Sequence, residues 1–243
     1  MDAKQAVAGH KAHVEFRVGS AAFEIVRIPA GHFGMGSPQH EHGHDPDEGP
    51  VRRIHISRAF YLGKYEVTQA QYRAVMGMVE ASNYHGDEYP MDSVPLDHAL
   101  TFCQKLSHLT GLRVVLPTEA QWEYACRAGT HTRFYTGDAE ADLARAGWYE
   151  GNTEHLHPVG QKEPNAFGLY DMLGNAGEMC QDELTDYAAM GATNPEGSVS
   201  SSRTALRGGA WMLPINACRC ASKTVAGTFM PSQGQGLRIA ILP

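Results

Sequence analysis

From residue 129 to its C-terminus, this chain consists of short apolar pieces separated by Gly, Pro, Asn and Asp. No helical period in this half extends beyond two turns, so the sequence predicts that much of it is loop. Buried loop backbone still needs hydrogen-bond partners, and long β-ladders are not there to supply them. Bound metal is one economical solution, because calcium is coordinated by backbone carbonyl oxygens as well as by carboxylates.

The first half carries more regular patterns. Apolar alternation predicts a strand over 21–30, the glycines at 31–36 break it, and the polar stretch 37–50 is expected to be a loop. Residues 51–56 and 60–62 predict a second strand that returns to the core. Three helices follow, over 68–76, over 98–106 and from Thr118 onward. Thr68 and Thr118 are placed to cap two of them, and Gly111 ends the other.

Composition excludes several classes of function. With 42% hydrophobic and 19% charged side chains in 243 residues, the chain has the composition of a globular domain. Its formal charge is -7 and it has no run of Lys or Arg, so nucleic acid is not an expected partner. No apolar stretch reaches the roughly 18 residues that a membrane span needs.

The N-terminal residues 1–20 are interpreted as a flexible leader before one domain at 21–243. They lack the apolar core of a secretory signal. The protein as given is therefore expected in the cytoplasm, and it would be exported or attached to the cell surface if a signal has been trimmed.

The five cysteines, at 103, 126, 180, 218 and 220, form neither a CxxC pair nor a zinc spacing. Their odd number argues against a complete disulfide framework, and reduced thiols are the simplest interpretation. Cys103 lies on the apolar face of the helix at 98–106, which favours a position in the core.

A series of ordered motifs extends over nearly the whole chain, from about residue 23 to residue 240. They read GMGS at 34–37, EGP at 48–50, FYLGKYEVT at 60–68, LPTEAQWEYA at 116–125, PVG at 158–160, PNAFGLYD at 164–171, GN at 174–175, RGG at 207–209 and GLR at 236–238. In this order the motifs resemble the formylglycine-generating-enzyme (sulfatase-modifying factor) family. The resemblance implies an α+β, C-type-lectin-like fold that is low in regular secondary structure, with two main helices packed on small twisted antiparallel sheets.

The family resemblance does not extend to the catalytic centre. Members that oxidise a sulfatase cysteine to formylglycine carry a copper-binding cysteine pair after Gly-Gly-Ser, with a serine and a tryptophan nearby. In this sequence Ala210 replaces the serine, and Leu213 stands where the first cysteine is expected. The family motif Asn-Ala-Trp-Glu-Trp reads NAGEM at 175–179, which removes the tryptophan. Because one fold supports different functions, the resemblance alone does not imply an enzyme.

Two enzymatic alternatives stay open at this point. Cys218 and Cys220, one residue apart, could hold copper as soft ligands in an oxygen-dependent oxidoreductase, although they align with an ordinary structural step of the family. The cluster of His40, His42 and His44 could imitate an iron or other metal site, but its loop aligns with a variable acidic loop, which favours solvated surface.

The resemblance also implies a structural calcium ion. The positions that hold it in the family carry Asp171, Gly174, Ala176 and Glu178 here. Two carboxylates with backbone carbonyl oxygens, at about 2.3 to 2.6 Å, suit a hard cation. The alternative is that the two carboxylates bond turn amides without a metal.

The last segment, 207–238, resembles that of variable proteins of diversity-generating retroelements, which display changeable residues on this scaffold. The first choice is therefore a non-catalytic member of the family that binds a protein or a small-molecule ligand at a C-terminal, lectin-like surface. The second choice is a metal-dependent oxidase, or an enzyme that modifies a peptide or small molecule. The residues predicted to bind are Trp211, Met212, Leu213, Ile215, Asn216, Cys218, Thr224, Val225, Phe229 and Met230.

Overall fold

The structure is a computed structural model, and it describes residues 3–80, 82–183, 187, 190–197, 204–226 and 233–243. Within these residues the strands form three sheets. The first, in the order β1-β2-β5-β11-β6, contains β1 (His13–Val18), β2 (Ala21–Ile28), β5 (Phe60–Gly63), β11 (Ala240–Leu242) and β6 (Arg113–Val115). The second, in the order β10-β7-β8-β9, contains β10 (Gln235–Gly236), β7 (Gly177–Glu183), β8 (Thr204–Arg207) and β9 (Lys223–Val225). The third pairs β3 (Gly31–Met35) with β4 (Arg52–Ile56).

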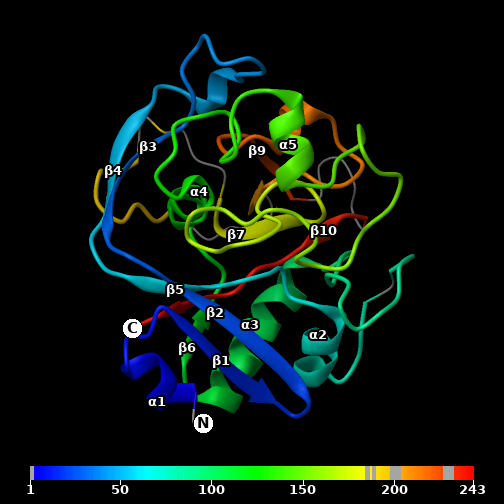
Figure 1. The fold of residues 1–243 in the computed structure, drawn as a ribbon. Coiled ribbons are helices and arrows are strands. Elements are labelled where there is room, and N and C mark those ends of the chain that lie inside the picture. Colours follow the sequence, from blue (N-terminus) through cyan, green and yellow to red (C-terminus); the bar gives the residue numbers. More distant parts are fainter. Residues whose placement is uncertain (1–2, 81, 184–186, 188–189, 198–203, 227–232) are drawn as a thin grey trace.

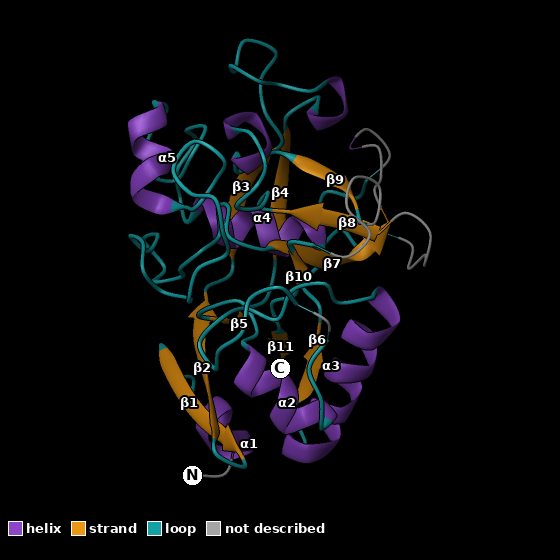
Figure 2. Cartoon of the chain, turned by 90° about the vertical axis from the view of Figure 1, so that its right-hand side faces the viewer, coloured by secondary structure: helices purple, strands orange, loops and turns teal. Residues whose placement is uncertain are grey.

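The helices divide between the two ends of the molecule. The α-helices are α1 (Ala3–Ala8), α2 (Gln69–Met76), α3 (Leu96–Thr110), α4 (Glu119–Arg127) and α5 (Glu140–Ala146), and the short 3-10 turns are η1 (Pro46–Glu48) and η3 (Ile215–Cys218). Helices α1, α2 and α3 lie with the five-stranded sheet at one end (Figure 1). Helix α4 lies within the loop-rich other end, against β3, β7 and β8 (Figure 2). The prediction of a mixed fold with small sheets and few helices is confirmed.

Local capping signals position the predicted helices. The side chains of Thr68 and Thr118 each accept a hydrogen bond from the backbone N–H three residues on. The glutamine side chain at that position accepts one from the threonine N–H, so α2 and α4 both begin with a capping box. Helix α3 starts at Leu96, two residues before the expected start, after Pro95. It ends at Gly111 as predicted, with Gly111 in the left-handed region at φ 66°.

The prediction of a flexible leader over 1–20 is wrong for the residues that the structure describes. Residues 13–18 form β1, which pairs antiparallel with β2, and the rings of Phe16 and Phe23 stack at 5.1 Å. The physical reason is a period of two in the sequence: Val14 and Phe16 are buried while Glu15 and Arg17 face outward. The five-stranded sheet therefore begins at residue 13.

Two other strand predictions are corrected. Residues 51–56 and 60–62 were expected to act as one strand, but β4 pairs with β3 and β5 pairs with β2 and β11 in a different sheet. The strand predicted at 21–30 does end before Gly31, since β2 stops at Ile28, but residues 31–35 are themselves a strand, β3, which pairs with β4. The register Phe33↔Ile54 places both side chains in the core.

None of the helices in the described residues is both long and apolar enough to cross a membrane.

Candidate functional site

Two glycines start the predicted binding segment. Gly208 and Gly209 have φ of 89° and 72°, which favours glycine, and a Cβ on Gly209 would lie 2.5 Å from Cys218 Sγ. The turn they make allows the N–H of Trp211 to donate to Asn175 O at 2.9 Å. The segment therefore folds back over the loop that follows residue 171.

Arg207 links the same segment to α4. Its guanidinium is fully buried, contacts Glu123 and lies 3.7 Å from Glu119 Oε1. The same side chain donates to the carbonyl oxygens of Ala221 and Ser222, each at 2.7 Å. A helix, a strand and a loop are thus held by one cation, which fixes where residues 209–224 meet the surface.

An apolar pocket of about 350 Å³ opens in this segment. It includes two of the predicted binding residues, Leu213 and Thr224, and no cysteine is among its lining residues. The residues that line the pocket are Leu206, Gly209, Leu213, Pro214, Ala217, Ser222, Lys223 and Thr224. A concave, mostly apolar wall with a few polar groups is the usual character of a small-ligand or side-chain pocket.

Trp211 belongs to a group of five rings, here called the aromatic cluster, made of Tyr84, Trp148, His155, His157 and Trp211. The ring of Tyr84 meets Trp211 edge-on at 5.7 Å, and His155 at 6.4 Å. His157 stacks on Trp148 at 3.7 Å and contacts His155 at 4.2 Å. Burial lowers the pKa of His157, assisted by the neighbouring His155 and a nearby lysine, so this ring is neutral near pH 7.

The predicted binding residues differ in solvent exposure. Trp211, Met212, Leu213, Ile215, Thr224 and Val225 are half-buried, Asn216 is exposed, and Phe229 and Met230 lie outside the described residues. The prediction that Cys218 takes part in the surface is wrong, because its side chain is fully buried. Its position in η3 turns the thiol inward, where it approaches Ala210 O at 3.9 Å.

In the structure the polar contacts of Cys218 and Cys220 are with other partners and do not join the two thiols. Cys220 Sγ lies 3.6 Å from Cys126 Sγ, on α4, while the polar contact of Cys218 is with a backbone carbonyl. Burial raises the pKa of the Cys218 thiol to about 12, so this thiol is protonated at neutral pH. Cys103 is buried in the core, as predicted.

Both thiols are fully buried, so oxidation is expected to join Cys126 to Cys220 only when local opening of the protein exposes them. Two thiols would pass two protons and two electrons to oxidised glutathione, which leaves as two thiol molecules, and the new bond would close a loop of 94 residues. Such a bond is expected to raise the free energy of unfolding by about 2–4 kcal/mol. Mass spectrometry of the oxidised protein should find one linked peptide pair, absent in Cys126→Ser and kept in Cys103→Ala. A pair that includes Cys218 instead would contradict the geometry.

The four positions expected to bind calcium surround a buried charged group. Glu66, Asp171 and Glu178 are almost fully buried near a single guanidinium, that of Arg238. Both oxygens of Glu178 accept from Arg238, at 2.6–3.0 Å, and Oε2 also accepts from Trp122 Nε1 at 2.7 Å. Glu178 is therefore already occupied by a cationic partner.

Asp171 is the other carboxylate among the four positions expected to bind calcium. Its Oδ2 accepts from Gly160 N at 2.7 Å, but its buried Oδ1 has no hydrogen-bond partner. Burial raises the pKa of Asp171 to about 6. Across the described residues no group of three or more His, Cys, Asp or Glu is arranged to hold a metal ion, which applies to the histidines at 40–44 as well. There, His44 Nδ1 instead bonds Ser37 Oγ at 2.7 Å.

Several residues of the site could not be read from the sequence. Tyr84, Trp148 and His155 come from connections that carry no motif of the resemblance, and only the fold brings them to Trp211. Each is an aromatic ring in a loop with polar neighbours, and this local pattern does not indicate which other ring it will contact.

Comparisons with known proteins identify the family and the fold of this chain. A family model described as Sulfatase-modifying factor enzyme 1-like domain matches residues 14–242. The formylglycine-generating enzyme of Bos taurus is 28% identical over 89% of this chain and 74% of its own length. Treponema denticola variable protein 1 superimposes with a TM-score of 0.83 at 26% identity, covering 96% of this chain and 100% of the other. PvdO from Pseudomonas aeruginosa gives 0.84 at 27% identity, covering 96% and 99%. The chain therefore belongs to the sulfatase-modifying factor family and shares the fold of the Treponema denticola variable protein and of PvdO.

Proposed function

We propose that this chain is a non-catalytic binding protein that holds a protein or small-molecule ligand at its C-terminal surface, of which the structure describes residues 207–226 and 233–238. The observation that carries the proposal is the apolar pocket of about 350 Å³ at Leu213 and Thr224, with half-buried Trp211 in the same segment. Apolar concave surface and aromatic side chains supply most of the binding free energy at such sites.

The chemistry around the pocket supports binding over oxidation. Ala210 and Leu213 stand where the resemblance places a serine and the first reactive cysteine, and neither side chain ionises or binds metal. The remaining thiol of this turn, Cys218, is buried and has a pKa of about 12. A thiol must lose its proton to act as a nucleophile or a metal ligand, and this environment opposes that loss.

We also infer that residues 207–238 are the variable segment of a diversity-generating retroelement. The similarity to Treponema denticola variable protein 1 along the whole chain supports this inference. The test is in the DNA: a near-copy of the sequence that encodes 207–238 should lie close to the gene, with differences confined to codons of the surface residues. A coding region without any such copy nearby would count against it.

The binding function is tested by blocking the pocket. Leu213→Arg places a charge and extra volume in the apolar wall, and it is expected to abolish binding to peptides and glycans that the parent protein retains on arrays. Leu109→Arg is the matched control, because Leu109 is 55% exposed on α3, at the opposite end of the molecule. Equal loss in both variants, or no loss in either, would contradict the assignment. Oxygen uptake with a cysteine-containing peptide should stay at background for the parent protein.

We propose, separately, that calcium binds beside Asp171. Three buried carboxylates face the guanidinium of Arg238, with Lys162 near Asp171, so an excess of negative charge remains when all three are ionised. Burial and the neighbouring carboxylates raise the pKa of Glu66, and a divalent cation would favour its ionised form. Asp171 Oδ1 has no hydrogen-bond partner among the described residues. Gly174 and Ala176 would contribute backbone carbonyl oxygens. Glu178, which holds Arg238, is the predicted ligand that the contacts favour least.

Calcium is expected to raise the unfolding temperature of the chelator-treated protein by several degrees, since a ligand of the native state alone stabilises it. Magnesium should have a smaller effect, because this ion demands stricter octahedral geometry. In Asp171→Asn the response to calcium should disappear. A parent protein whose unfolding temperature is the same with calcium and with chelator would contradict the proposal.

A further inference from the structure

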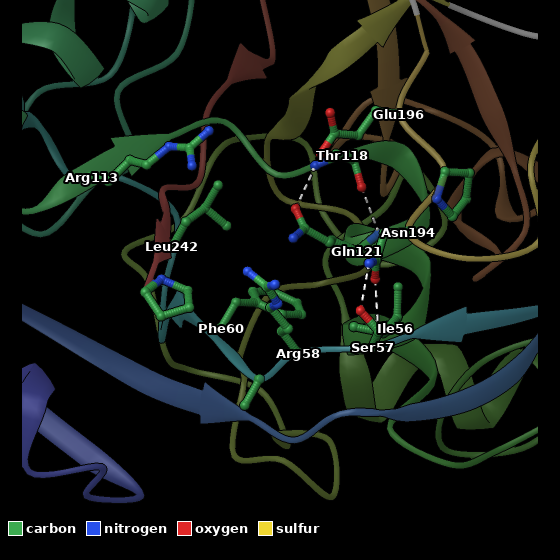
Figure 3. A pocket seen from close by; sticks show the side chains of 13 residues that line it. Ile56, Ser57, Arg58, Phe60, Arg113, Thr118, Gln121, Asn194, Glu196 and Leu242 are labelled. Atoms are coloured by element: carbon green, nitrogen blue, oxygen red, sulfur yellow. Dashed lines mark hydrogen bonds between the residues drawn. The ribbon is translucent and has the colours of Figure 1, made fainter.

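A second pocket, separate from residues 207–238, lies where the β4–β5 connection meets the start of α4 (Figure 3). Its volume is about 250 Å³. The residues that line it come from four parts of the chain: Ile56, Ser57, Arg58, Ala59, Phe60, Arg113, Thr118, Gln121, Asn194, Pro195, Glu196, Leu242 and Pro243. None of them belongs to the binding surface proposed above.

The pocket has an apolar side. Ile56 and Phe60 are each 2% exposed and form part of the core, and Leu242 is half-buried beside them. In Figure 3 the Leu242 side chain projects into the open space of the pocket. A wall of this kind accepts the hydrocarbon part of a ligand without loss of hydrogen bonds.

The same pocket carries cationic groups that the protein does not neutralise. Within the described part of the chain, the guanidinium groups of Arg58 and Arg113 make no hydrogen bond and no ion pair. Glu196 is the acidic side chain among the lining residues, and Pro243 carries the terminal carboxylate of this chain. Within the described residues neither carboxylate makes an ion pair with Arg58 or Arg113, so both guanidinium groups remain open to an anionic ligand.

Hydrogen bonds hold the polar wall in place. Asn194 Oδ1 accepts a hydrogen bond from Ser57 N at 2.8 Å, and Asn194 Nδ2 donates to Ser57 Oγ at 2.6 Å. These two bonds fix the loop beside Arg58. Gln121 Oε1 accepts from Thr118 N at 3.0 Å in the capping box of α4. With its oxygen engaged, Gln121 keeps its amide N–H groups as donors, and Figure 3 shows this amide and the head of Arg58 facing the same space.

We propose that this pocket binds the carboxylate of a small amphipathic organic acid. A guanidinium offers parallel N–H donors that match a carboxylate, and Gln121 adds a neutral donor. The hydrocarbon part of the acid lies against Phe60 and Leu242. Glu196 disfavours a doubly charged anion such as phosphate, because its carboxylate is a like charge in the same pocket.

Benzoate is a suitable probe, and its binding is measured by titration calorimetry and by shifts of backbone amide signals. The parent protein is expected to bind benzoate saturably, with shifts at residues 56–60 and 121. In Arg58→Gln and Arg113→Gln the affinity should fall at least fivefold, about the value of a lost charged hydrogen bond at an exposed site. Arg17→Gln, a 61% exposed side chain on β1, is the control and should bind as the parent does.

Neutral benzamide and inorganic phosphate complete the experiment. Both should bind at least fivefold more weakly than benzoate, since one lacks the charge and the other the apolar body. Absence of saturable benzoate binding to the parent protein would overturn the proposal. So would equal binding of benzamide or phosphate, or benzoate affinity that is unchanged in both arginine variants while their unfolding temperatures match the parent.

Discussion

Replacing Arg238 with methionine is expected to lower the free energy of unfolding by about 3–5 kcal/mol, because it leaves buried carboxylates without their cation. Besides Glu178, Arg238 donates to Gly63 O at 2.9 Å and to Tyr170 O at 2.8 Å. Methionine fills a similar volume, so the loss reflects charge and hydrogen bonding more than a cavity. Urea unfolding followed by circular dichroism measures it.

A surface arginine provides the control for this variant. Arg145 makes ion pairs with Asp142 and Glu163, but all three side chains are at least partly exposed. Arg145→Met should therefore unfold at nearly the same urea concentration as the parent, since water already solvates these charges. If Arg238→Met lost no more stability than Arg145→Met, the buried cation would not be a structural centre of this fold.

Replacing Gly174 with alanine is the second change with a large expected effect, a loss of about 2–4 kcal/mol. Gly174 has φ of 76°, and a Cβ there would lie 2.0 Å from Trp148 O. Two backbone hydrogen bonds hold these loops close together: Gly174 N donates to Gly208 O at 2.7 Å, and Asn175 N donates to Trp148 O at 2.8 Å. The new methyl group would push apart the loops that carry Trp148 and Trp211, so the aromatic cluster should loosen as well.

The substitution Gly77→Ala is a control that measures backbone strain without steric crowding. It has φ of 81° at the C-terminus of α2, but nothing lies within 4 Å of the position that a Cβ would take. Gly77→Ala is expected to cost about 1 kcal/mol, which is the strain of a left-handed alanine. Tryptophan fluorescence should change in Gly174→Ala alone. Equal destabilisation by the two substitutions would show that contact with Trp148 adds nothing.

The parts of the fold that could be predicted are those that local chemistry determines. Thr68 and Thr118, each three residues before a glutamine, fix the starts of α2 and α4 through bonds that close within one turn. Strand partners depend on residues far away in the sequence. For that reason the sequence did not reveal that β4 and β5, only three residues apart, join different sheets, or that β1 adds to the sheet edge.

The candidate site was partly predictable for the same reason. Trp211 and Leu213 could be placed at a surface because they follow the glycine turn at 208–209, whose motif is part of the family resemblance. The sequence did not indicate that Cys218 turns inward, since η3 reverses the alternation that a strand would give. The pairing of Cys220 with Cys126, and the arginines of the second pocket, depend on contacts between distant segments.

Elemental analysis of the protein, purified without chelators from cells grown with copper and iron, distinguishes a ligand-binding family member from a metal-dependent oxidase. Leu213 and Ala210 offer no ligand for a metal, and the Cys218 thiol is buried and protonated. Copper and iron are therefore expected far below one atom per chain. Copper or iron at one atom per chain would contradict a binding role without a metal-dependent catalytic centre.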